Sequence, residues 1–182
     1  MTAPSSPHLR PQEVQARNGR RYILRTIKAS DAPSLIRGYE ALSPQDRWFR
    51  MLHAMPEMSE ASALAFCTPD LESDFCLVLE GQDELTSEIL GGARITGDAS
   101  GKNCEFSVSL RPEVRRLGLA QAALRMALQA AADAGYERVY GAIARDNRAM
   151  INLAVLLGFN IRNNPDDPTL VIAERSLSTP VD

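Results

Sequence analysis

The segment Arg115-Arg116-Leu117-Gly118-Leu119-Ala120 lies between an alternating strand pattern and an alanine-rich helix pattern, and its residue types could bind an anion. N–H groups at the start of a helix have no helical partner, and the helix dipole adds partial positive charge around them. Gly118 lets the backbone close around an anion, and Arg115 and Arg116 can add charge-assisted contacts. The segment predicts a diphosphate-binding turn. The alternative is a plain strand-to-helix turn that needs glycine for its geometry.

Glu105 could supply acid–base chemistry on the preceding strand. Alternate strand residues point to opposite faces, so the apolar residues of 104–110 share one face, while Glu105, Ser107 and Ser109 share the other. The stretch from Glu105 to Leu110 spans roughly 16 Å at a rise of about 3.3 Å per residue, which is comparable to the reach of a pantetheine arm. A cofactor with its diphosphate on the turn would bring a thioester near Glu105. The alternative is a surface glutamate on a half-buried strand.

Composition and residue counts argue against several other kinds of site. The chain has 20 basic and 23 acidic residues and a net charge of -3, which gives no electrostatic basis for a nucleic-acid partner. Cys67, Cys76 and Cys104 have no C-x-x-C spacing, so we expect buried, reduced thiols and no zinc site. The histidines are His8 and His53, too few for a histidine metal site or a Ser-His-Asp triad. We therefore expect no metal.

The length and composition fit one domain. A chain of 182 residues, 45% of them hydrophobic, predicts a single α/β or α+β domain. Prolines and polar residues predict a flexible N-terminal tail over 1–18, so the domain spans 19–177 and a C-terminal tail follows at 178–182. No apolar run approaches the length of a membrane span, and the N-terminus lacks the apolar core of a secretory signal. These features favour a cytoplasmic protein without a membrane partner.

Periodicity and capping residues place the elements that would position these side chains. Helix starts are marked by Ser30-Asp31 with Pro33, and by Ser43 with Pro44. The segment 97–103 has glycines one residue too close for a P-loop and is predicted to be a hairpin loop. The expected strands are 22–28, 75–80, 89–96, 104–110, 138–144 and 169–176, and the further helices are 59–67, 119–134 and 147–157.

The order of these elements predicts a mixed sheet. Polar connectors join the strands 75–80, 89–96 and 104–110, which favours an antiparallel meander. The helix 119–134 separates the strands 104–110 and 138–144, which predicts a right-handed crossover between parallel neighbours. The predicted turn and Glu105 both belong to this crossover unit.

These motifs resemble the GNAT family of N-acetyltransferases. The family's acyl-CoA-binding signature, Q/R-x-x-G-x-G/A between a strand and a helix, is matched by Arg115, Gly118 and Ala120. Pro112-Glu113-Val114 resembles the family's entry loop, and 146–159 resembles its asparagine-initiated helix with a terminal Gly-Phe. The motifs are specific in combination, although each alone is a weak signal.

The resemblance covers residues 20–176, and residues 42–50 are most similar to the catalytic domain of bacterial Pat-type protein-lysine acetyltransferases. It implies a mixed, mostly antiparallel α/β (α+β) sheet of roughly six to seven strands, splayed between the fourth and fifth strands and flanked by helices. It also implies acetyl-CoA as co-substrate and an amine, preferably a protein lysine, as acceptor. Glu105 would then be the general base, directly or through a water, for attack in a ternary complex without an acyl-enzyme.

The resemblance also implies which residues bind the cofactor. Backbone groups of Val108, Ser109 and Leu110 would hold the pantetheine by strand-like hydrogen bonds. The diphosphate would lie on the signature turn, which consists of Arg115, Arg116, Leu117, Gly118, Leu119 and Ala120. Asn147 would reach the cofactor from the next helix. Its alternative role is a helix N-cap, and the two roles can coexist.

The general acid stays open. Many relatives carry a tyrosine in the last helix that protonates the leaving thiolate, and the corresponding residue here is Ala154. Tyr140 is a substitute candidate that also fits a packing role in the sheet. A coenzyme A thiolate that leaves without a dedicated acid is the third alternative.

The acceptor and the oligomeric state stay open as well. Arg47, Trp48 and Arg50 lie where the family builds its acceptor site, although Trp48 more often belongs to a core. A small-molecule amine and a protein N-terminus are alternatives to a lysine, and a non-catalytic acyl-CoA sensor is an alternative to an enzyme. We expect a homodimer about as much as a monomer. The strand from Thr169 is expected to be an exposed edge of the sheet, which could pair with a second copy.

Overall fold

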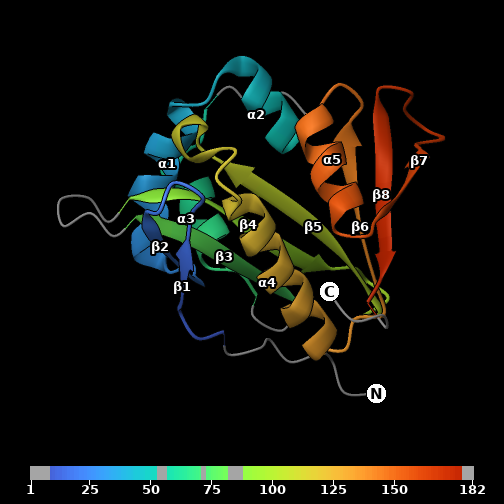
Figure 1. The fold of residues 1–182 in the computed structure, drawn as a ribbon, viewed down its shortest axis with the longest axis horizontal. Coiled ribbons are helices and arrows are strands. Elements are labelled where there is room, and N and C mark those ends of the chain that lie inside the picture. The colour runs from blue at the N-terminus through green and yellow to red at the C-terminus, as the bar shows by residue number, and fades with distance from the viewer. Residues whose placement is uncertain (1–8, 53–56, 71–72, 82–87, 178–182) are drawn as a thin grey trace.

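The computed structural model describes residues 9–52, 57–70, 73–81 and 88–177, which build one eight-stranded sheet with helices on both faces (Figure 1). The strands are β1 (Gln12–Gln15), β2 (Arg21–Thr26), β3 (Asp74–Gly81), β4 (Ile89–Gly97), β5 (Asn103–Leu110), β6 (Arg138–Ala144), β7 (Asn160–Asn163) and β8 (Leu170–Ser176). The helices are α1 (Ala32–Glu40), α2 (Pro44–Met51), α3 (Glu60–Cys67), α4 (Leu119–Asp133) and α5 (Arg148–Leu156). The mixed architecture predicted from the sequence is confirmed.

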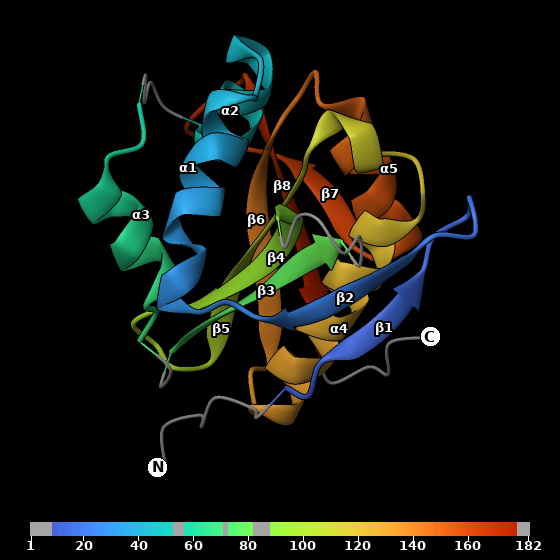
Figure 2. The ribbon, with the colours of Figure 1, turned by 90° about the vertical axis from the view of Figure 1, so that its left-hand side faces the viewer.

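Two apolar cores lie on opposite faces of the sheet. Helices α1 and α3 cover one face and α4 covers the other (Figure 2). On one face α4 packs through Ala123, Ala127 and Ala131, whose small, fully buried side chains let the helix approach the strands closely. On the other face α1 and α3 build a second core around residues such as Leu35 and Tyr39. The apolar side of β5 joins the α4 core, and its polar side faces the α1 and α3 layer.

The sheet order is β1-β2-β3-β4-β5-β6-β8-β7, and β5 and β6 form its parallel pair. That pair is short, because Asn103–Glu105 of β5 pair with Arg138–Tyr140 of β6 and the two strands then separate. The sequence analysis predicted a splay between the fourth and fifth expected strands, 104–110 and 138–144. These strands are β5 and β6 of the structure, so the predicted splay is confirmed. The outer part of β5 therefore has a strand partner on its β4 side and none on its β6 side.

Phe106 and Gly141 lie where this pairing ends. A Cβ atom on Gly141 would stand 2.8 Å from Cε1 of Phe106 and 3.0 Å from its carbonyl oxygen, so the aromatic ring occupies the space of a side chain at position 141. The Phe106 ring also contacts Phe159, with the ring centroids 4.8 Å apart. The ring thus fills the start of the gap between β5 and β6 from the α4 side of the sheet.

Two predicted helix starts are confirmed by their caps. Ser43 Oγ accepts a hydrogen bond from Asp46 N at 3.1 Å at the start of α2, where Pro44 takes the first helical position. Ser59 Oγ accepts from Ser62 N at 3.1 Å at the start of α3. These caps are local in the sequence, which explains why the pattern of residues predicted them.

The first strand corrects the prediction of a flexible tail over 1–18. β1 lies inside that range and pairs with β2 from Gln12 opposite Leu24 to Gln15 opposite Arg21. Its burial pattern has one partly buried residue, Val14, so the sequence shows almost no alternation there. Backbone hydrogen bonds to β2 order the segment, and such bonds leave no signal in the sequence.

β7 was likewise not predicted, and it changes the edge of the sheet. It pairs with β8 from Asn160 opposite Glu174 to Asn163 opposite Val171. β8 lies between β6 and β7, so the expectation that the strand from Thr169 is an exposed edge is wrong. The strand number is eight in the described residues, above the predicted six to seven. No helix within those residues is long and apolar enough to cross a bilayer.

Gly141→Ala is expected to lower the free energy of unfolding by about 1–3 kcal/mol, because the new Cβ atom overlaps the Phe106 ring and backbone. Gly81→Ala is the matched control in another strand, where the new Cβ atom would meet Leu90 Cδ1 at an ordinary 3.4 Å. Urea denaturation followed by circular dichroism measures both. Equal effects of the two substitutions would contradict the packing role of Gly141.

Candidate active site

The signature turn has the backbone geometry of an anion-binding loop. Arg116 and Gly118 adopt positive φ angles of 62° and 83°, which curl the chain immediately before α4. The helical hydrogen-bond ladder begins with Ala122 N donating to Gly118 O at 3.1 Å, so the preceding N–H groups of the helix lie outside it. Gly118 is the N-cap and has no side chain that could satisfy them. The turn can therefore donate several N–H groups to one anion.

A groove of about 530 Å³, called the turn groove below, runs from this turn to α5. Eight of the expected cofactor-binding residues line it, namely Val108, Ser109, Leu110, Arg115, Arg116, Gly118, Ala120 and Asn147. Leu117 and Leu119 are the exceptions. Leu119 is buried in the α4 core and Leu117 packs against that core, so their side chains hold the turn in place.

The two arginines of the turn differ in their contacts. Arg115 Nε donates to Leu110 O at 3.1 Å, and its Nη2 lies 2.9 Å from Asp46 Oδ1 on α2. Arg115 therefore connects the turn with the end of β5 and the first turn of α2. Arg116 has no hydrogen bond or ion pair with the part of the chain that the structure describes. Its guanidinium is the more available of the two for a ligand.

Arg17 also lines the turn groove, and the sequence analysis did not find it. Its backbone N–H donates to Leu117 O at 3.1 Å, and its Nε lies 3.7 Å from the position of a Cβ atom on Gly118. The β1–β2 hairpin brings it there, across 100 residues of sequence from the turn. The sequence around Arg17 shows no strand alternation, so it does not indicate that this arginine lies beside Gly118.

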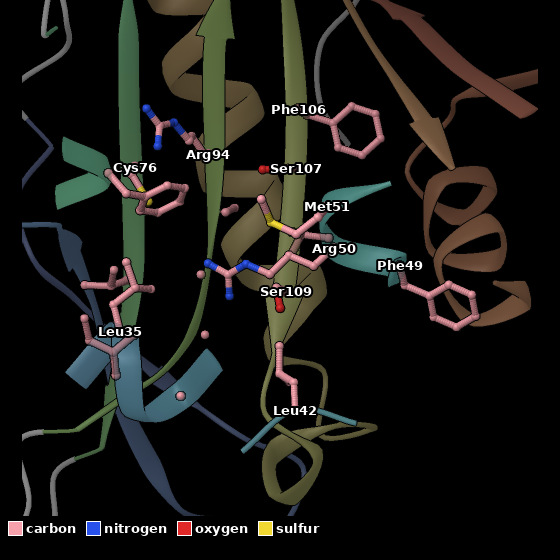
Figure 3. Close-up of a pocket in the computed structure, with 18 of the residues that line it drawn as sticks. Leu35, Leu42, Phe49, Arg50, Met51, Cys76, Arg94, Phe106, Ser107 and Ser109 are labelled. Atoms are coloured by element: carbon pink, nitrogen blue, oxygen red, sulfur yellow. The ribbon is translucent and has the colours of Figure 1, made fainter. Parts of the chain in front are cut away.

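Glu105 lines a second cavity, called the sheet cavity below, which measures about 270 Å³. This cavity lies between the strands β3 to β5 and the helices α1 to α3, and Figure 3 shows part of its lining. Ser107 and Ser109 line it from the same strand. Solvent reaches Glu105, yet desolvation by the surrounding protein raises the pKa of its carboxyl above the ordinary value. No described cation pairs with this carboxylate. A carboxylate with a raised pKa and no ion-pair partner suits a general base.

The two cavities meet beside β5. Six residues line both of them, namely Phe49, Arg50, Val108, Ser109, Asn147 and Met150. The turn groove and the sheet cavity therefore adjoin along the outer half of β5. The predicted anion-binding turn lines the first cavity and Glu105 lines the second.

Asn147 takes the alternative role that the sequence left open. Its Oδ1 accepts from Met150 N at 3.1 Å, so it caps α5. The residue nevertheless lines both cavities, and its Nδ2 group can still donate a hydrogen bond. The cap fixes the side chain at the junction of the two cavities.

The two residues discussed for the general acid lie in different surroundings. Ala154 is fully buried in the apolar core, so nothing at this position reaches a ligand. Tyr140 stands in register with Glu105 across the short parallel pairing, and burial raises the pKa of its hydroxyl. The structure brings Tyr140 beside Glu105, but it does not line the sheet cavity.

The cysteines are buried and reduced, as predicted. Burial raises the pKa of the thiols of Cys76 and Cys104 to about 12, so neither is a thiolate near neutral pH. Within the described residues no cluster of three or more His, Cys, Asp or Glu side chains is arranged to hold a metal ion.

A family model for the acetyltransferase (GNAT) domain matches residues 21–160. The chain therefore belongs to the GNAT acetyltransferase family, as its motifs suggested, and is an acetyltransferase. The members of this family use acetyl-CoA as co-substrate.

Known relatives agree with this assignment. Acetyltransferase PA5475 of Pseudomonas aeruginosa is 27% identical over 160 residues, which cover 88% of this chain and 86% of that protein. The GNAT domain of S. lividans PAT has a TM-score of 0.80 at 20% identity, over 91% of this chain and 96% of that one. Mycobacterium smegmatis RimJ, solved in complex with CoA-disulfide, has a TM-score of 0.69 at 16% identity, over 91% and 86% of the two chains. The S. lividans structure confirms the GNAT-like fold.

Alkylation is expected to leave Cys76 and Cys104 unmodified in the native protein at pH 8, because their thiols are buried and neutral. Both should react fully in denaturant. Peptide mass spectrometry after iodoacetamide treatment measures each site. Rapid native labelling of Cys104 would contradict its exclusion as a nucleophile.

Proposed function

We propose that this acetyltransferase moves an acetyl group from acetyl-CoA to a primary amine by direct attack in a ternary complex, with Glu105 as general base. The observation that carries the proposal is that the cavity lined by the signature turn adjoins the cavity lined by Glu105 along one strand, β5. A protein lysine is the preferred acceptor, since residues 42–50 resemble the Pat branch. The similarity to the GNAT domain of S. lividans PAT is consistent with that preference.

In this proposal the diphosphate of the cofactor binds at the signature turn. The N–H groups before Ala122 and the guanidinium groups of Arg116 and Arg17 supply the contacts. The RimJ complex with CoA-disulfide supports a coenzyme A site on this fold.

The pantetheine arm then follows β5 toward Glu105. Beyond Glu105, β5 has no partner on its β6 side, so the N–H and C=O groups of Val108 to Leu110 on that edge can bond the pantetheine amides. Nδ2 of Asn147 can donate from the opposite wall. The splay of the sheet thus creates a cofactor site that resembles strand addition.

The chemistry needs one proton acceptor and a close approach of two substrates. Glu105 takes a proton from the ammonium group of the acceptor, and the free amine forms a C–N bond with the acetyl carbonyl carbon. The C–S bond then breaks, and the second proton that the nitrogen loses on becoming an amide goes to the departing coenzyme A thiolate. No dedicated acid is required, since a thiol with an ordinary pKa of about 8.5 gives a tolerable leaving group. Holding both substrates together supplies much of the rate.

Glu105→Gln is expected to lower kcat/KM by about a hundredfold to ten-thousandfold and to leave the dissociation constant of coenzyme A unchanged, because it removes the base and no cofactor contact. In the unmutated enzyme kcat/KM should rise with pH as Glu105 ionises, over a range shifted upward by its raised pKa. That limb of the profile should vanish in the variant. Steady-state assays that follow the release of free coenzyme A, with a panel of amines and lysine peptides, measure kcat/KM and its pH profile.

Glu137→Gln is the matched control, since Glu137 is an exposed residue that pairs with Lys102 away from both cavities. An unchanged rate in Glu105→Gln would refute the base assignment. Coenzyme A binding without transfer to any acceptor by the unmutated protein would favour the sensor alternative.

Arg17→Gln is expected to weaken coenzyme A binding by about threefold to tenfold, because it removes a partly solvated cation from the diphosphate end. Arg20→Gln removes the same charge three residues away, outside the turn groove, and should have little effect. Isothermal titration at low and high salt measures both, and the loss should shrink at high salt. A similar loss of affinity in the two variants would show that Arg17 acts only through the net charge of the protein and not through a contact with the diphosphate.

A further inference from the structure

Arg50 extends from the last turn of α2 across the face of the sheet (Figure 3). Its guanidinium points past β5 toward β4, on the side where Ser107 and Ser109 line the sheet cavity. Arg50 also lines the turn groove, so it lies at the junction of the two cavities. A cation here is next to the place where the proposed acceptor must bind.

Three arginines line the sheet cavity, and Arg50 differs from the other two. Arg94 forms a bidentate ion pair with Asp74, with Nε 2.9 Å from Oδ1. Arg111 pairs with Glu88 at 2.6 Å. Among the residues that the structure describes, no carboxylate is paired with Arg50, whose Cζ lies over the ring of Phe66, 5.6 Å from the ring centroid.

The surroundings of Arg50 make an anionic partner favourable. Burial lowers the pKa of Arg50, and the neighbouring positive charge of Arg94 acts in the same direction. The thiol of Cys76 nearby stays neutral, since its pKa is about 12. An arginine remains charged even so, and a partly buried cation is more stable with a counter-ion than without one. Arg94 also lies over the Phe66 ring, but its charge is balanced by Asp74, whereas no described carboxylate balances Arg50.

We infer that the acceptor amine carries a carboxylate, and that this carboxylate binds Arg50 in the sheet cavity. The inference rests on the proposed function and names the substrate class of the same site. The planar guanidinium matches a carboxylate with two parallel hydrogen bonds, and the hydroxyls of Ser107 and Ser109 can add more.

The charges of the cavity also orient such an acceptor. Glu105 attracts the ammonium end and Arg50 the carboxylate end, so a molecule with both charges binds in one direction. This direction presents the amine to the base. The carboxylate belongs either to a free amino acid-like amine or to an acidic residue beside a lysine, and the chemistry at Arg50 is the same.

The experiment compares acceptors that differ only in this charge. One arm uses γ-aminobutyrate and ε-aminocaproate, each against its carboxamide. The other arm uses peptides with one lysine flanked by glutamate or by glutamine. The carboxylate form should have a kcat/KM at least about tenfold higher in one arm, and that arm identifies the source.

Arg50→Gln should abolish this preference by raising KM for the carboxylate acceptors, while the carboxamides keep their rate. Arg50→Lys should retain part of the preference because it keeps the charge without the planar fork. Arg21→Gln is the matched control, since Arg21 is exposed on β2 outside both cavities. Circular dichroism and the dissociation constant of coenzyme A establish that each variant is folded.

Binding separates this inference from the proposed function. Titration of butyrate and butyramide into the protein saturated with coenzyme A should show binding of butyrate alone, and its loss in Arg50→Gln. If no amine is acetylated but this binding persists, the proposed function fails and the carboxylate site stands. Equal rates for carboxylate and carboxamide acceptors, or a preference that survives in Arg50→Gln, would overturn the inference.

Discussion

The divergence of β5 and β6 is the constraint on which the site depends. The two strands pair over three residues and then separate at Phe106 and Gly141, where the Phe106 ring occupies the space of a side chain at position 141. Because pairing stops there, the outer half of β5 keeps an unpaired edge inside the molecule. That edge, which would be a liability on a surface, lies between the signature turn and Glu105 and is the track along which the two cavities meet.

Helix α2 connects the two ends of this track. Asp46 in its first turn binds Arg115 of the signature turn, and Arg50 in its last turn reaches into the sheet cavity. The cap of Ser43 determines where the helix begins, so both residues take their positions from one local interaction. A short helix therefore contacts both the signature turn and the sheet cavity, although it contributes no residue to the buried core.

Much of the fold was predictable because its signals are local. Alternation along β5, the caps of α2 and α3 and the alanine face of α4 each lie within a few residues, and the structure has all of them. β1 and β7 were missed because backbone pairing with a neighbouring strand holds them, and it leaves almost no pattern in the sequence. The same reason hid Arg17, which reaches the turn through the β1–β2 hairpin.

The sequence alone determined the family, the signature turn with Gly118, and the position of Glu105 on the polar side of β5. These depend on residue types at short spacing, where the physics of a turn or a strand acts within one segment. Only the tertiary structure decided that Arg115 binds Asp46 while Arg116 stays available, and that Arg50 faces a cavity in which its neighbours Arg94 and Arg111 are paired. The state of a charge depends on which other charges lie around it in space, and that is a property of the packed chain.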